Sequence, residues 1–195
     1  MKTLLRIITV SIVMFGIMAF VEATDNSTTG YIETKFFGIK LTALELSVPN
    51  LPIELRKDHY GFLYAIGHAE SSNRYDVVNK FGYMGKYQFG KATLKGLGYK
   101  NLNKRTFLKD SVLQEQVMEE LLKHNAEVLS RQIKKYDGKI VNGVYVTKSG
   151  ILAAAHLAGP SNVKKWLRNG TRFEDGLGTR LRTYIIKFSG YKLDI

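Results

Sequence analysis

Cysteine is absent from the 195-residue sequence, and its absence excludes several classes of site. Without cysteine the chain can form no disulfide, no cysteine–metal site and no lipid anchor on an N-terminal cysteine. Proline is also scarce, with three residues, and tryptophan occurs once. The fold must therefore be held together by a hydrophobic core, without covalent cross-links.

Long hydrophobic runs are lacking as well. The longest apolar segment, residues 7–20, is interrupted by polar residues and glycine. It is shorter than the roughly 20 residues that a membrane-spanning helix needs. Lys2 and Arg6 precede it, and small residues up to Ala23 follow it, which is typical of a secretory signal peptide. We expect residues 1–23 to be removed, with a periplasmic or secreted product; an uncleaved membrane anchor is the alternative.

Acidic residues are few. The chain has 17 Asp and Glu against 29 Lys and Arg, a formal net charge of +12, and loss of Lys2, Arg6 and Glu22 with the leader leaves +11. Such an excess favours a polyanionic partner. We find no nucleic-acid motif and no aromatic ladder interleaved with arginine. An exported basic protein is expected to meet an anionic cell wall or membrane surface, although solvated surface charge explains most of these lysines equally well.

The remaining residues indicate one mainly helical domain behind a short arm. Residues 24–52 are mixed and threonine-rich without a helical period, which favours an extended or poorly ordered N-terminal arm, and the domain covers residues 53–195. No internal repeat is visible. A hairpin is predicted around Asn142-Gly143, the strongest short turn signal available. Apolar periodicity predicts helices over residues 53–69, 87–95, 110–136 with a break near Asn125, 151–158 with Ser149 as N-cap, 160–170 and 179–188.

Glu70 is the most informative residue of the predicted first helix. It lies four residues after Ile66 and seven after Leu63, so the three share one face. A carboxyl group is thus placed on the stripe that would enter the core. Burial disfavours the charged form and raises the pKa of a carboxyl, which would make a general acid available near neutral pH. A helical glutamate held by a hydrogen bond in a structural network is the alternative.

Three blocks of sequence resemble one family. AESSN, GYMGKYQF and AAHLAGPSNV are similar, in this order, to the ES, GLMQ and AYNAGPGNV blocks of lytic transglycosylases and goose-type lysozymes. In the second block Gly85-Lys86-Tyr87 precedes Gln88, as in phage-associated wall-cleaving domains. In the third, His156 replaces the usual tyrosine and Leu157 the usual asparagine. The resemblance covers residues 53–188 and implies a lysozyme-like α+β domain, mainly α, with a small β-hairpin.

The resemblance implies cleavage of peptidoglycan. Such enzymes break the β-1,4 bond between N-acetylmuramic acid and N-acetylglucosamine, and one glutamate, here Glu70, acts first as acid and then as base. The muramyl C6 hydroxyl closes a 1,6-anhydro ring, so no second carboxylate is obligatory, whereas ordinary glycosidases use a pair. Asp76, the nearest acidic residue after Glu70, is either the second carboxylate of a hydrolytic lysozyme or a cap of the turn. No cofactor is implied.

Six residues are expected to contact the glycan or to support Glu70. Gln88 would hydrogen-bond the sugar, and Ser71 would orient Glu70 or the acetamido group. For each residue a structural role as a cap or core side chain is the alternative. The residues predicted to bind substrate are Ser71, Tyr83, Met84, Gln88, His156 and Tyr184.

Histidines suggest no metal site. The other three, His59, His68 and His124, do not have zinc-ligand spacing, and HAE is not HExxH. A neutral His156 could donate one hydrogen bond, whereas a charged one would lower the pKa of Glu70 and weaken it as an acid. Two functional classes therefore remain: a peptidoglycan-cleaving enzyme, either transglycosylase or lysozyme, and a wall-binding module that has lost turnover.

Overall fold

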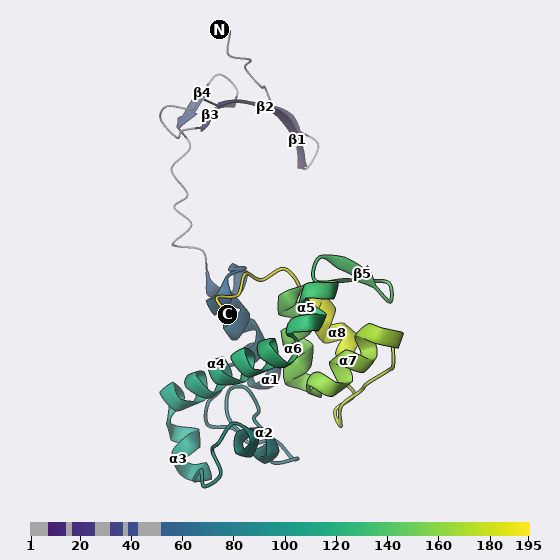
Figure 1. Ribbon diagram of the computed structural model, residues 1–195. Helices are drawn as coiled ribbons and strands as arrows, with labels where there is room; N and C mark the ends of the chain where they lie inside the picture. Colours follow the sequence, from purple (N-terminus) through teal and green to yellow (C-terminus); the bar gives the residue numbers. More distant parts are fainter. Residues whose placement is uncertain (1–7, 15–16, 26–31, 37–38, 43–51) are drawn as a thin grey trace. The chain divides into compact units, whose positions relative to one another are not determined.

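The computed structural model describes residues 8–14, 17–25, 32–36, 39–42 and 52–195 (Figure 1). The chain divides into two compact units, Met1–Leu51 and Pro52–Ile195. Among the described residues no helix is long and apolar enough to cross a membrane.

The first unit contains an antiparallel sheet of four strands in the order β1-β2-β3-β4. Ile8 lies opposite Ala23, and Met14 lies opposite Ile17, in the pairing of the first two strands. The predicted leader therefore includes β1 and most of β2. Residues 1–7 and 15–16 of the leader lie outside the described residues. The same holds for residues 26–31, 37–38 and 43–51 of the predicted arm. Signal peptide and arm stay predictions. The strands are β1 (Ile8–Met14), β2 (Ile17–Asp25), β3 (Ile32–Phe36) and β4 (Ile39–Thr42).

The second unit is mainly helical with one small hairpin, which confirms the predicted fold class. In the turn of the hairpin, Asn142 and Gly143 both have positive φ, 50° and 72°, as a tight two-residue turn requires. The elements are η2 (Ile53–Leu55), α1 (His59–Ser71), α2 (Lys91–Gly96), α3 (Lys104–Lys109), α4 (Ser111–Val128), α5 (Ser130–Tyr136), β5 (Lys139–Val141), β6 (Val144–Val146), α6 (Lys148–Ala158), α7 (Pro160–Asn169) and α8 (Leu181–Lys187).

Several predicted helix boundaries are wrong, and capping side chains explain two of them. The first helix begins six residues late, because the Asp58 carboxylate accepts a hydrogen bond from Gly61 N and caps α1 there. Thr147, not Ser149, caps α6. The break in the long helix falls at Leu129 rather than near Asn125. The segment predicted as a helix over 87–95 is helical only from Lys91, and α3 was not predicted.

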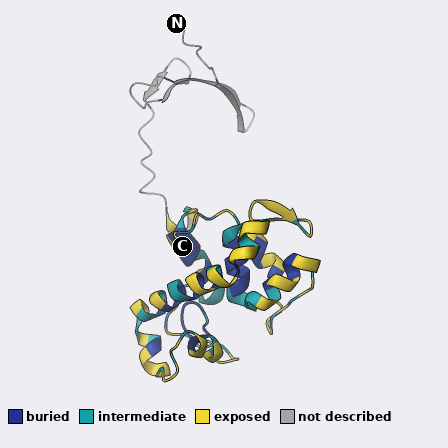
Figure 2. Ribbon diagram, viewed as in Figure 1, coloured by how far each residue is buried: buried dark blue, intermediate teal, exposed yellow. Residues whose placement is uncertain are grey.

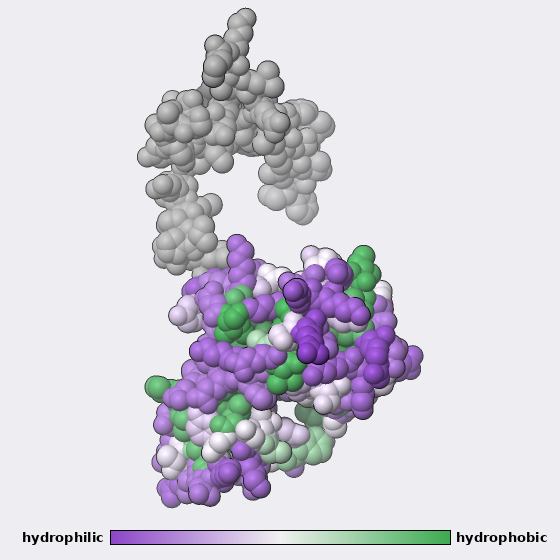
Figure 3. All heavy atoms as spheres, viewed as in Figure 1, coloured by the Kyte–Doolittle hydropathy of each residue, from purple (hydrophilic) through white to green (hydrophobic). Residues whose placement is uncertain are grey.

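Helix α6 forms the centre of the helical core (Figure 2). It packs against α4, α7 and α8, and residues 149–155 are all buried. Gly150 makes the contact with α8 possible, because a β-carbon there would lie 2.5 Å from the carbonyl oxygen of Ile185. Polar residues dominate the visible face of this unit (Figure 3). The close approach of α6 and α8 fixes the positions of His156 and Tyr184.

Candidate active site

Glu70 lies in the last turn of α1 and meets side chains from two distant elements. The Tyr184 hydroxyl of α8 donates a hydrogen bond of 2.6 Å to Glu70 Oε1. His156 Nε2, at the end of α6, lies 3.7 Å from the same oxygen. The Glu70 side chain is 16% exposed, and that of His156 is 6% exposed. Within residues 52–195 no hydrogen bond reaches Glu70 Oε2, so this oxygen is available to a ligand.

Tyr184 is held in its protonated form. Burial, and then the negative charge of Glu70, raise the pKa of the Tyr184 hydroxyl above its ordinary value of 10.0. The hydroxyl therefore remains a donor at every physiological pH, and it keeps Glu70 Oε1 occupied as an acceptor. This arrangement distinguishes the two carboxyl oxygens: Oε1 accepts the Tyr184 hydrogen bond, and Oε2 accepts none from residues 52–195.

The loop between α1 and α2 forms the wall beside Glu70. Gln88 in this loop has a positive φ of 49°, which is uncommon for a residue with a side chain. Its side-chain amide donates to the Gly85 carbonyl at 2.9 Å. Tyr83 is 43% exposed, whereas Met84 is buried. The backbone of Met84 pairs with that of Phe89. Gln88 and Tyr83 thus lie at the surface of the cleft, and Met84 lies in the core beneath it.

Ser71, which follows Glu70, is engaged with the backbone. Its hydroxyl donates to the Lys86 carbonyl at 2.8 Å and accepts from Arg74 N at 3.0 Å. Among the described residues it makes no hydrogen bond to Glu70. The side chain therefore joins the end of α1 to the glycine-rich loop.

A polar network that the sequence did not predict anchors this loop to α4. Glu115 accepts from Lys86 Nζ at 2.7 Å, from the Tyr75 hydroxyl at 2.6 Å and from the Tyr87 hydroxyl at 2.6 Å. The neighbouring Gln114 accepts from Lys86 N at 2.9 Å and donates to the carbonyls of Tyr75, at 3.1 Å, and Phe107, at 2.8 Å. The network ties both ends of the loop to one helix.

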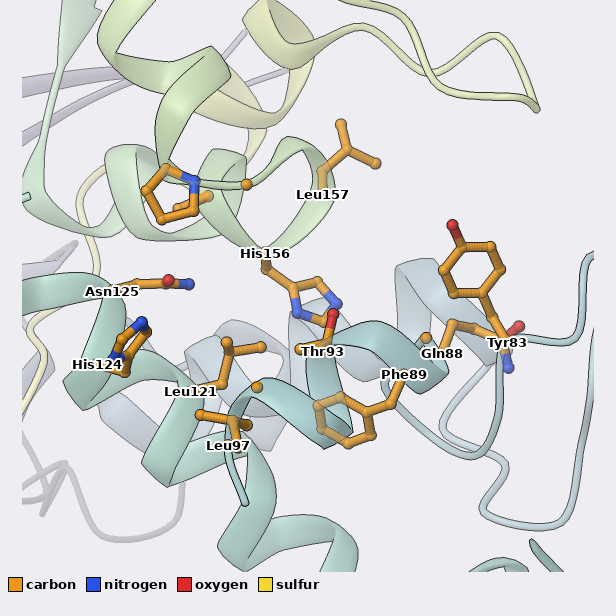
Figure 4. A pocket seen from close by; sticks show the side chains of 15 residues that line it. Tyr83, Gln88, Phe89, Thr93, Leu97, Leu121, His124, Asn125, His156 and Leu157 are labelled. Atoms are coloured by element: carbon orange, nitrogen blue, oxygen red, sulfur yellow. The ribbon is translucent and has the colours of Figure 1, made fainter. Parts of the chain in front are cut away.

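Two adjoining cavities form a cleft along Glu70. The smaller one, about 100 Å³, is lined by Glu70 and by the loop residues Phe81 and Asp175. The larger one, about 310 Å³, extends toward α2 and α4 (Figure 4). The walls of both cavities include Tyr83, Gln88, His156 and Leu157. Of the residues predicted to form the site, Glu70, Tyr83, Gln88 and His156 line the cleft, Tyr184 contacts Glu70, and Ser71 and Met84 are not among its walls.

The two candidate second carboxylates differ in position. Asp76 is 75% exposed, lies 3.6 Å from Arg74 Nε and does not line either cavity. Asp175, in the loop between α7 and α8, lines the Glu70 cavity. One of its oxygens accepts from the backbone N–H groups of Leu177, at 2.8 Å, and Thr179, at 2.7 Å. No local sequence signal singles out Asp175, because the fold brings it to Glu70 from more than 100 residues away.

Residues 52–195 contain no group of three or more metal-ligating side chains. The described residues of the cleft supply two carboxyl groups, those of Glu70 and Asp175, together with hydroxyl, amide and imidazole side chains. Comparison with known proteins identifies no similar family: no family model matches the chain, and no curated protein matches it significantly.

Proposed function

We propose that the protein is a peptidoglycan lytic transglycosylase that cleaves the β-1,4 bond between N-acetylmuramic acid and N-acetylglucosamine. One observation carries the proposal: Glu70 has one oxygen held by Tyr184 and the other without a hydrogen-bond partner among residues 52–195, in a cleft whose walls include the side chains of Gln88 and Tyr83. The three sequence blocks that resemble lytic transglycosylases contribute Glu70, Gln88 and His156 to this cleft. The lysozyme-like topology belongs to the proposal.

The mechanism uses Glu70 twice. In the first step the proton on Glu70 Oε2 passes to the glycosidic oxygen as the bond from that oxygen to muramyl C1 breaks. In the second, the Glu70 carboxylate takes the proton of the muramyl C6 hydroxyl, whose oxygen bonds to C1. The products are a free 4-hydroxyl on glucosamine and a 1,6-anhydromuramyl end, and Glu70 regains its proton. No water is consumed.

Neighbouring side chains hold the reacting groups. Tyr184 keeps Glu70 Oε1 as an acceptor, so the proton is directed to Oε2. Gln88 and Tyr83 form the wall along which the sugar ring lies, and amides suit its neutral hydroxyl and acetamido groups. His156 Nε2, 3.7 Å from Glu70 Oε1, lies beside the carboxylate that forms between the two steps.

A hydrolytic muramidase is the second candidate, and the position of Asp175 favours it. Two-carboxylate glycosidases activate water with a second acidic side chain. Asp175 lines the Glu70 cavity, whereas Asp76 does not. Against this role, one Asp175 oxygen is already bonded to two backbone N–H groups of its own loop. The two candidates differ in their product, since hydrolysis leaves a reducing end and transglycosylation leaves an anhydro end.

Export and charge fit the same substrate. A signal peptide over residues 1–23 would deliver the protein to the periplasm or beyond, and the basic surface would attract it to anionic wall polymer. We propose that the partner is the peptidoglycan glycan strand, that neither nucleic acid nor stable membrane insertion is involved, and that the protein acts as a monomer without a cofactor.

The test is digestion of purified sacculi, with the released muropeptides analysed by mass. Glu70→Gln retains shape but cannot deliver a proton, so release should fall by about 10⁴-fold or more, because acid and base steps are each worth about 10²–10⁴. Asp76→Asn is the matched control and should retain most activity. Anhydro products that persist at the wild-type rate in Glu70→Gln would refute the assignment of the acid.

Two other outcomes identify the alternatives. Reducing ends among the products, together with loss of turnover in Asp175→Asn, would establish the muramidase. Binding to sacculi without any release by the wild-type protein would identify a module that retains the cleft and has lost turnover.

A further inference from the structure

A cavity lined by arginine lies between the hairpin turn, the end of α7 and the start of α8 (Figure 1). Its volume is about 530 Å³. Arg172 comes from the loop after α7, Arg180 lies just before α8, and Arg182 lies in the first turn of α8. No described residue lines both this cavity and the two cavities along Glu70. The proposed glycan chemistry therefore gives these arginines no role.

The charge on the wall of this cavity is unbalanced. Glu174 is the only carboxylate among the described residues that line it, and its Oε2 lies 3.2 Å from Arg180 Nε. Arg172 and Arg182 form no ion pair within residues 52–195. Three positive charges and one negative charge leave the wall with a formal charge of +2. Arginine stays protonated in proteins, so this excess persists at every physiological pH, and a bound anion would offset it.

Phosphate suits three guanidinium groups better than a carboxylate does. Each guanidinium offers five N–H donors in a planar fork that matches phosphate and carboxylate oxygens. A carboxylate has two oxygens, which a single fork can engage, whereas the three terminal oxygens of a phosphate monoester can accept from several forks at once. A monoester also carries about −1.5 to −2 charge at pH 7, which nearly balances the wall.

The remaining wall can hold the organic group that carries the phosphate. Trp166 is buried and Phe173 is half-buried, and the two rings supply apolar surface to the cavity. Asn142, in the hairpin turn, donates a hydrogen bond of 2.7 Å to the Trp166 carbonyl and so fixes the turn against α7. The volume lies within the range of about 300–1,000 Å³ that is usual for small-molecule sites.

We propose that this cavity binds a small phosphate monoester. Arg172 and Arg182 donate to the phosphate oxygens, and the two aromatic rings contact the organic part of the ligand. Arg180 is divided between the ligand and Glu174, so the Glu174 carboxylate competes with the phosphate. The proposal is independent of the chemistry proposed for Glu70, because the two sites share no residue.

The experiment measures the affinity of the full chain for glycerol 3-phosphate by calorimetry at pH 7. Arg182→Gln should weaken binding about tenfold or more, as expected for loss of hydrogen bonds to a charged group. Arg105→Gln is the matched control, because it removes the same charge from α3, which Figure 1 shows well away from α7 and α8. It should change the affinity by less than about twofold, since distant surface charges are screened by salt.

Glu174→Gln should have the opposite effect. It releases Arg180 and raises the formal charge of the wall from +2 to +3. The affinity for glycerol 3-phosphate should therefore rise about two- to fivefold, the size expected for one exposed charge pair. The side chains of Glu174, Arg105 and Arg182 are exposed, so none of these substitutions should shift the midpoint of thermal unfolding.

Three results would overturn the proposal. The first is equal affinity of the wild type and Arg182→Gln for glycerol 3-phosphate, or no binding by either the wild type or Glu174→Gln. The second is equal binding of free glycerol, which lacks the phosphate. The third is binding to phosphatidylglycerol vesicles that depends on Arg182 while glycerol 3-phosphate does not bind, because the ligand would then be a membrane surface and not a small monoester.

Discussion

Two buried polar side chains of α4, Gln114 and Asn125, differ in their hydrogen bonding. Near the start of the helix, the Gln114 amide accepts from Lys86 N and donates to the Tyr75 carbonyl of the loop beside Glu70, and the half-buried Glu115 accepts from side chains of the same loop. Near its end, Asn125 is as deeply buried, yet its amide nitrogen has no partner among the described residues. The Gln114 amide therefore holds the loop in the folded protein, whereas the Asn125 amide nitrogen contributes no such bond.

The largest effect on stability is expected from Gln114→Leu. Gln114 is fully buried and satisfies three backbone groups, namely Lys86 N and the carbonyls of Tyr75 and Phe107. Removing it leaves these groups unpaired in the interior, which should cost about 3–5 kcal/mol of the free energy of unfolding, since each buried orphan costs about 1–3 kcal/mol. Urea denaturation at pH 7 measures it.

The comparison fails if Gln114→Leu and Asn125→Leu have the same effect on stability. Both substitutions place leucine in α4, so helix propensity and added apolar volume are similar. Gln116→Leu on the exposed face should stay within about 0.5 kcal/mol of the wild type. Equal losses from the two substitutions would show that hydrogen bonding within the protein does not decide what a buried amide of α4 contributes to stability.

Local patterns predicted much of the fold, and pairing between distant residues was beyond them. The hairpin at Asn142-Gly143 and the apolar helix that became α6 follow from short-range rules. The break assigned near Asn125 was wrong because Leu129 ends α4. Asn125 instead lies inside the helix and lines the larger cavity.

The candidate site was predicted in part. The pairing of Glu70 with Tyr184, 114 residues apart, was expected only from the family resemblance. Ser71 lies next to Glu70 in sequence but points its hydroxyl to the Lys86 carbonyl. Asp175 and Asn125 were missed, because a loop carboxylate and a helical amide carry no local signal of the cleft they will line. Their positions depend on how α4, α6 and α8 pack, which periodicity does not specify.

Alkaline pH should weaken the attachment of the loop beside Glu70 through its buried tyrosines. Burial first, and then Glu115, raise the pKa of Tyr75 and of Tyr87 above the ordinary 10.0. The folded state holds these protons more tightly than the unfolded state, so their contribution is complete below pH 10 and is lost as pH rises toward the raised values. For fully buried Tyr87 the loss should be about 1 kcal/mol between pH 10 and 11.

Urea denaturation of Tyr87→Phe at pH 8, 10 and 11 isolates the part of the stability loss that comes from Tyr87. The variant should be less stable than the wild type at pH 8, because Glu115 loses a hydrogen-bond donor. Its stability should then fall less steeply with pH, because one buried hydroxyl no longer has to stay protonated. Parallel pH profiles for the two proteins would show that Tyr87 is not held protonated by the fold.

The smallest effect is expected from Ser71→Ala, and it tests on which side of the comparison Ser71 belongs. Its hydroxyl is paired with Lys86 O and Arg74 N, as the Gln114 amide is paired with the same loop. Removal should therefore cost about 1 kcal/mol of stability, the worth of one ordinary hydrogen bond. Turnover of sacculi per folded molecule should stay within about threefold of the wild type, because the Tyr184 bond to Glu70 is untouched. The opposite result, unchanged stability with turnover lowered about 100-fold, would place Ser71 among the groups that act on Glu70 or the sugar. It would also mean that the Ser71 hydroxyl turns into the cleft when the glycan binds.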